Sequence, residues 1–143
     1  MTLHNLPCAC ASLRRAARAV THHYDEALRP VGIRITQFTL LQMLARIGPL
    51  TQGALGAQLA MDSTTLSRTL RPVEEAGWIR SRPGRDRRER YVELTKAGLR
   101  TLHRVTPAWE TAQRDLRHRL GEGAWGDLGP LLTATVRAAR AES

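Results

Sequence analysis

Lysine is almost missing from this chain of 143 residues, because Lys96 is the only lysine among 22 lysines and arginines. Acidic residues number 13, so the formal net charge is +9. A small domain with this excess of positive charge usually binds a polyanion, and nucleic acid is the first candidate. Arginine suits phosphates, guanine edges and narrow minor grooves. Codon bias also favours arginine, so the sign of the charge is more informative than the ratio of arginine to lysine.

Long apolar runs are also missing. No stretch approaches the roughly 20 residues of a membrane-spanning helix, and residues Met1 to Pro7 lack the basic flank and apolar stretch of a secretory signal. We therefore expect a cytoplasmic protein. Hydrophobic residues still make up 42% of the sequence, enough for a folded core in a single domain of this length.

Cysteine is scarce, with only Cys8 and Cys10 present. The loop that they would close is tiny, which argues against a disulfide-built secreted fold. Two interpretations stay open. The pair lies at the entry to a predicted helix, where the helix N-terminus and Arg14 or Arg15 would stabilise a thiolate, so it could sense oxidants or soft metals. Alternatively, both are small, half-buried residues without a chemical role.

The motifs of hydrolytic enzymes do not occur. The sequence has no Gly-rich phosphate loop, no Gly-x-Ser-x-Gly elbow and no paired carboxylates in an apolar context. We therefore expect neither enzymatic activity nor a cofactor. His22 and Glu26 share one face of a predicted helix at a spacing that metals accept, but two ligands do not make a site.

Hydrophobic periodicity predicts a mostly helical chain. The expected helices cover residues 10–28, 36–47, 51–59, 63–76, 96–120 and about 125–136. Thr36 and Asp62 are the expected N-caps of the second and fourth helices, and Thr51 opens the third. Gly53 and Gly56 weaken the third helix, so packing must hold it. We expect Pro107 to bend the long fifth helix.

Between the fourth and fifth helices, residues 78–82 and 90–95 have the composition of two strands joined by a basic loop. Two short helices, a tight turn and a hairpin make a winged helix-turn-helix. We therefore expect a mostly α fold with a small β-hairpin, flanked by N- and C-terminal dimerisation helices. In this single domain (1–143), residues 36–95 form the DNA-binding core, and residues 8–30 and 96–142 form a homodimer through their apolar stripes.

The fourth predicted helix has two unlike faces. Four polar residues lie within an arc of about 100°, opposite three apolar ones. The polar residues are Thr64, Ser67, Arg68 and Arg71; the apolar ones are Leu66, Leu70 and Val73. Arginines and short hydroxyls suit the major groove. An ordinary solvated face would look similar, but the tight turn before it and the basic hairpin after it favour DNA recognition. Pro72 either bends this helix or starts a new turn.

The hairpin loop is the second charged feature. Between positions 80 and 90 lie six arginines and two acids, Asp86 and Glu89. The Asp86 carboxylate, two residues before Arg88, can orient that guanidinium while it reaches a minor groove. The alternative is a solvated run of charge.

From residue 36 to 95 the sequence resembles the MarR family of bacterial regulators. The resemblance lies in Asp62-Ser63-Thr64-Thr65-Leu66-Ser67-Arg68, Glu75-Ala76-Gly77-Trp78-Ile79, Asp86-Arg87-Arg88, Val92-Glu93-Leu94-Thr95 and Ala97-Gly98. It implies a triangular homodimer whose recognition helices enter successive major grooves of a pseudo-palindrome, with wing arginines in the flanking minor grooves. Family members are often repressors released by small aromatic or phenolic ligands, metals or oxidants. Pro72 departs from the family's commoner uninterrupted recognition helix.

The resemblance also implies which residues contact DNA. The helix contacts are Ser63, Thr64, Ser67, Arg68 and Arg71; the wing contacts are Asp86 and Arg88, to which we add their neighbours Arg85 and Arg87. Tyr24, Trp109 and Trp125 either line a cavity for a small aromatic effector or belong to the core. The alternative to a specific regulator is a nonspecific architectural DNA- or RNA-binding protein.

Overall fold

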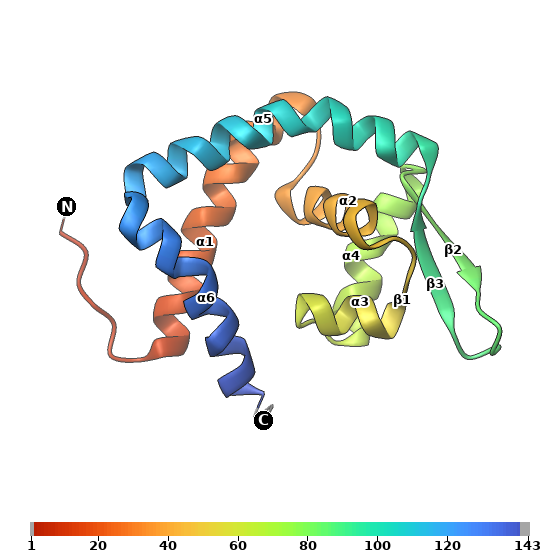
Figure 1. Cartoon of the computed structure of the whole chain (residues 1–143), viewed down its shortest axis with the longest axis horizontal. Helices are drawn as coiled ribbons and strands as arrows, with labels where there is room; N and C mark the ends of the chain where they lie inside the picture. The colour runs from red at the N-terminus through yellow and green to blue at the C-terminus, as the bar shows by residue number, and fades with distance from the viewer. Residues whose placement is uncertain (1, 141–143) are drawn as a thin grey trace. The chain divides into compact units, whose positions relative to one another are not determined.

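The computed structural model describes residues 2–140 (Figure 1). The chain forms two compact units, Met1–Trp109 and Glu110–Ser143. The first unit holds the winged helix-turn-helix. Its elements are α1 (Ala9–Leu28), the 3-10 turn η1 (Arg29–Val31), α2 (Ile35–Ile47), β1 (Leu50–Thr51), α3 (Gln52–Leu59), α4 (Ser63–Glu75), β2 (Ile79–Pro83), β3 (Arg90–Leu94) and the first part of α5 (Lys96–Leu120). The second unit holds the rest of α5 and α6 (Glu122–Ala139). The predicted fold class is confirmed.

The core of the first unit draws on every helix and on the sheet. Its fully buried side chains include Leu28, Phe38, Leu41, Leu55, Val73, Ile79, Val92 and Val105. The hydrophobic spacing of α2 predicts a buried stripe of Phe38, Leu41, Leu44 and Ala45; the first three are buried, but Ala45 is exposed and Leu40 is buried instead. The predicted periodicity therefore located the helix, and packing against the sheet and α4 shifted its buried face.

The predicted hairpin forms from β2 and β3, which pair antiparallel with Ile79 opposite Leu94 and Pro83 opposite Arg90. A third strand, β1, was not predicted. It pairs with the other edge of β3, Leu50 opposite Val92 and Thr51 opposite Tyr91, so the sheet order is β1-β3-β2. Two residues are too few to show alternation, and this strand exists only because β3 provides a free edge.

The predicted N-cap of α4 is confirmed, and Thr51, predicted to open α3, is the N-cap of that helix. The Thr51 hydroxyl accepts a hydrogen bond from the Ala54 amide (3.1 Å), and Asp62 caps α4 in the same way. The prediction for Thr36 is wrong, because α2 begins at Ile35. Side chains satisfy the amides at the start of α2. The Arg34 amide donates to the side-chain oxygen of Gln37, and the Ile35 amide donates to the carboxylate of Asp25 in α1 (2.7 Å).

Three prolines, Pro72, Pro107 and Pro130, lie inside continuous α-helices. Helix α4 continues through Pro72 to Glu75, so no new turn begins there. Helix α5 continues through Pro107 to Leu120.

In the second unit, Arg117 forms a bidentate pair with Glu122 (2.9 and 2.7 Å) across Gly121, whose φ of 91° allows the chain to reverse direction between α5 and α6. Within residues 2–140, none of the helices combines the length and the apolar character needed to cross a membrane.

Candidate nucleic-acid interface

Helix α4 starts where the sequence predicts, because the Asp62 carboxylate accepts a hydrogen bond from the Thr65 amide (2.7 Å). That bond holds the pKa of Asp62 below its usual value, so the cap is charged at neutral pH. Leu66 and Leu70 on the inner face are 3% exposed, and Val73 is fully buried. On the outer face, five predicted contact residues are exposed: Ser63, Thr64, Ser67, Arg68 and Arg71.

None of these five side chains hydrogen-bonds or pairs with another residue in the described part of the chain. By contrast, the Thr69 hydroxyl on the flank of the same helix donates to the Thr65 carbonyl (2.8 Å). The exposed face therefore keeps its donors and acceptors available for an external partner.

A close approach between α3 and the following turn fixes the angle at which α4 begins. The Met61 amide donates to the Gly56 carbonyl (2.9 Å), and a Cβ on Gly56 would lie 3.0 Å from the Met61 carbonyl oxygen. Ala60, between them, has a left-handed backbone with φ of 54°. Gly56 lowers the helix propensity of α3, but glycine is required at this position because a larger residue would force the turn away from the helix.

The wing tip is a short turn that Asp86 organises. The Gly84 amide bonds to the Glu89 carbonyl (2.9 Å), and the Glu89 amide bonds to the Asp86 carbonyl (3.0 Å). The Asp86 carboxylate accepts from the backbone amide of Arg88 (3.1 Å) rather than, as the sequence had predicted, from the Arg88 guanidinium. Asp86 therefore shapes the loop and leaves the guanidinium free.

Five of the six arginines of the wing fall into two groups, and the sixth, Arg90, lies in β3. On the stem, Arg80 and Arg82 both donate to the Glu93 carboxylate, Arg82 at 3.2 Å, and the Arg82 guanidinium lies 5.0 Å from the Tyr91 ring centre. The hydrogen bond from Arg80, followed by that from Arg82, lowers the pKa of Glu93. At the tip, the exposed Arg85, Arg87 and Arg88 form no ion pair with any residue from 2 to 140.

The start of α3 lies beside the wing. This proximity was not predicted from the sequence. Thr51, Gln52 and Gly53 line one surface hollow together with Arg88 and Arg90. The pairing of β1 with β3 brings these segments together. A two-residue strand gives no periodic signal, so sequence reasoning had no means of placing α3 beside the wing.

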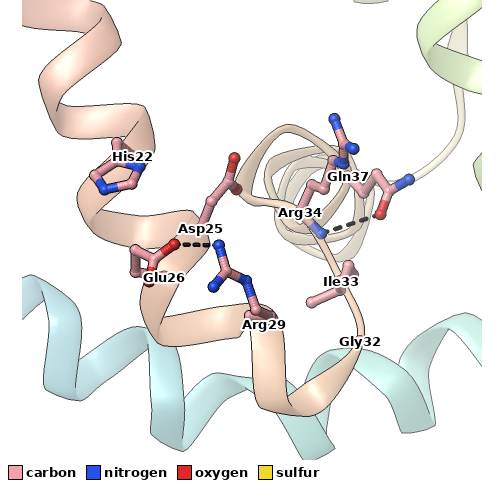
Figure 2. A pocket seen from close by; sticks show the side chains of 8 residues that line it. All are labelled: His22, Asp25, Glu26, Arg29, Gly32, Ile33, Arg34 and Gln37. Carbon is pink, nitrogen blue, oxygen red and sulfur yellow. Dashed lines mark hydrogen bonds and ion pairs between the residues drawn. The ribbon is translucent and has the colours of Figure 1, made fainter.

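A separate groove of about 570 Å³ lies between the end of α1 and the start of α2 (Figure 2). Its lining is polar: His22, Asp25, Glu26, Arg29, Arg34 and Gln37, with Gly32 and Ile33. His22 and Glu26 do share one side of α1, but Glu26 pairs with Arg29. No three His, Cys, Asp or Glu side chains of the described residues are arranged to hold a metal ion.

The predicted aromatic residues lie elsewhere. Tyr24 is buried, which raises the pKa of its phenol, and Trp109 packs beside Phe38 with ring centres 5.7 Å apart. Tyr24 is one of the buried hydrophobic residues, Trp109 packs against the core cluster, and neither lines the groove. Trp125 is half-buried in the second unit.

The two cysteines are free, exposed thiols rather than half-buried ones. Cys8 occupies the N-cap position of α1 and Cys10 lies in its first turn. Arg15 donates to the His4 carbonyl (3.0 Å), so its guanidinium holds the N-terminal segment.

Comparisons with known proteins agree on one family. Residues 33–89 match the sequence model of the MarR family. The HTH-type transcriptional regulator YwoH of Bacillus subtilis is 37% identical over 84 residues, which cover 59% of this chain and 61% of YwoH. The organic hydroperoxide resistance transcriptional regulator of the same organism is 33% identical over 62% of this chain and 61% of its own. These matches thus span about three fifths of either relative.

A structural match extends further. The transcriptional regulator MosR of M. tuberculosis, crystallised in complex with DNA, is 34% identical to this chain with a TM-score of 0.84. The match covers 94% of this chain and 97% of MosR.

Proposed function

Because the chain belongs to the MarR family of transcriptional regulators, we propose that it binds double-stranded DNA sequence-specifically as a homodimer and represses transcription. In this proposal α4 enters the major groove of each half-site of a pseudo-palindrome. The wing tip reaches the adjacent minor groove.

The exposed face of α4 carries this proposal. Its two arginines and three hydroxyls have no partner within the described residues, while the opposite face is buried. Arg68 and Arg71 suit guanine, and the hydroxyls of Ser63, Thr64 and Ser67 suit bases or phosphates. The wing tip contributes Arg85, Arg87 and Arg88, held by the turn that Asp86 shapes. A solvated surface helix needs no such concentration of unpaired donors beside a basic loop.

We further propose that the repressor responds to a small effector. Three effector classes fit the residues: an oxidant or a soft metal acting on Cys8 and Cys10, or a small aromatic ligand. The curated relative named for organic hydroperoxide resistance supports the oxidant class. The exposure of both thiols at the start of α1 also supports it, since reactive cysteines must be accessible.

Footprinting on the DNA around the protein's own gene tests the proposal. We expect a protected pseudo-palindrome with two half-sites roughly one helical turn apart, about 10 base pairs centre to centre. A nonspecific architectural DNA-binding or RNA-binding protein is the alternative. It would protect no symmetric site, and its affinity would be equal for operator and scrambled duplexes.

A further inference from the structure

The end of α4 has a fixed connection to the wing. Gly77 adopts a left-handed backbone (φ 78°), its amide bonds to the Glu74 carbonyl (2.9 Å), and the Trp78 amide bonds to the Val73 carbonyl (3.2 Å). This is a Schellman arrangement. The amides of Gly77 and Trp78 bond to the last turn of the helix in this arrangement, and their two carbonyls point away from it.

Both of those carbonyls bond to one residue, Thr95, at the far end of β3. The Thr95 hydroxyl donates to the Gly77 carbonyl (2.6 Å), and its amide donates to the Trp78 carbonyl (3.0 Å). The same hydroxyl accepts from the Gly98 amide (3.0 Å), and the Thr95 carbonyl accepts from the Leu99 amide (2.9 Å). Every polar group of Thr95 is therefore used, two toward α4 and the wing root and two toward α5.

Gly98 makes this junction tight. A Cβ at this position would overlap the Trp78 carbonyl oxygen, and the neighbouring backbone cannot yield as a flexible side chain would. The first turn of α5 thus packs directly against the wing root, where the hairpin begins (Figure 1).

We propose that Thr95 is a positioning residue for DNA recognition: its hydroxyl fixes the angle between the recognition helix α4 and the wing. This inference rests on the proposed function. The two proposed DNA-contacting surfaces are joined in sequence by Ala76, Gly77 and Trp78, and Thr95 bonds to the carbonyls of the last two. A small rotation at this root is magnified at the wing tip, so simultaneous contact with a major and a minor groove depends on it.

The test compares three proteins on an operator that the wild type selects from random duplexes, and on a scrambled duplex. Thr95→Val keeps the side-chain shape and both backbone bonds but removes the hydroxyl. Thr95→Ser restores the hydroxyl. Thr106→Val is the matched control, because the Thr106 hydroxyl bonds only to the Leu102 carbonyl within α5 (2.6 Å).

We expect Thr95→Val to reduce the ratio of operator to scrambled affinity roughly five- to tenfold, at a temperature where circular dichroism shows it folded. Thr95→Ser and Thr106→Val should keep the wild-type ratio within about twofold. On the Arg88→Ala background, where the wing contact is already lost, Thr95→Val should cost less than it does alone. An unchanged ratio in Thr95→Val, or strictly additive losses, would overturn the proposal.

Two further outcomes are separable. If Thr95→Val does not fold, Thr95→Asp is measured in its place, since a carboxylate caps Gly98 but cannot donate to Gly77. If the wild type selects no operator at all, the proposed function fails. If the wild type selects an operator and loss of the Thr95 hydroxyl leaves the ratio of operator to scrambled affinity unchanged, only the positioning role fails.

Discussion

Arg88 is the wing residue whose loss should be easiest to measure. Asp86 bonds to its backbone amide, so the guanidinium is exposed at a fixed point of the tip with no competing carboxylate in the described chain. We expect Arg88→Ala to abolish most specific DNA binding, at a cost on the order of 1–3 kcal/mol of binding free energy. The salt dependence of binding should flatten by about one phosphate equivalent. Titration at several salt concentrations measures both.

The matched control for this substitution is Arg46→Ala, which removes the same charge from the last turn of α2, outside the predicted interface. It should lower affinity little, while circular dichroism and light scattering show fold and assembly unchanged in both variants. Equal operator affinity for Arg88→Ala and wild type would refute the wing assignment.

Cys8 and Cys10 allow a test of the effector. Replacing both with serine keeps size and hydrogen bonding but removes the thiolate, so a regulator that senses through them should become unresponsive. We expect peroxide, an organic hydroperoxide or a soft metal ion to weaken operator binding by the wild type and not by the double variant. If the two proteins respond identically to all three, the cysteines are not the switch, and the inducer must be sought among small aromatic ligands.

Local chemistry decides which single residues the sequence could predict. The caps Thr51 and Asp62 were predictable because a cap bonds to an amide three residues ahead. The start of α2 was not, since one of its amides is satisfied by Asp25 from another helix. Similarly, counting charges within the wing loop overlooked Glu93, which lies across the hairpin from Arg80 and neutralises part of the stem.

At the scale of elements, the wing combines a partly neutralised stem with a charged tip. Glu93→Gln removes the carboxylate that holds Arg80 and Arg82. We expect nonspecific DNA affinity to rise and the salt slope to steepen by about one to two phosphate equivalents, because two arginines become available. Glu89→Gln is the matched control: it changes net charge equally, but Glu89 pairs with no arginine among the described residues. Equal effects of the two substitutions would contradict this role for Glu93.

The same carboxylate gives the wing a pH dependence of known sign. Hydrogen bonds from Arg80 and Arg82 lower the pKa of Glu93 in the folded protein. Its contribution to stability is therefore present above the unfolded-state pKa and lost as the pH falls through the lowered folded-state pKa. Nonspecific DNA binding should rise more steeply over that acidic range in the wild type than in Glu93→Gln, as filter binding at constant ionic strength would show.

Elements differ in how far sequence predicts them. The long helices were predictable from hydrophobic periodicity, and the hairpin from two β-prone segments around a Pro-Gly loop. Strand β1 was not, because its pairing to β3 depends on residues forty or more positions away. Since that pairing also places α3 beside Arg88, the third segment of the candidate interface was missed for the same reason.

At the scale of the whole molecule, α6 is the element that a single chain leaves unexplained. It has no buried residue, and Leu131, Leu132 and Val136 are 64%, 42% and 44% exposed. Leu13 and Val20 of α1 are also exposed. Apolar stripes of this extent cost free energy in water unless they are covered, and a second copy of the chain would cover them with closed symmetry.

We therefore predict a homodimer built from α1, α5 and α6. Truncation after Leu120 should leave an aggregating or unfolded chain, because obligate dimers seldom keep a stable monomer. Within the full chain, Leu132→Glu with Val136→Glu places carboxylates in the apolar stripe and should shift the mass by light scattering from dimer to monomer. Ala134→Glu, on the other side of α6, should not. Half-sites one helical turn apart require two linked recognition helices, so the double variant should also lose cooperative operator binding. A truncated chain that remains a soluble, folded, DNA-binding monomer would refute the dimer.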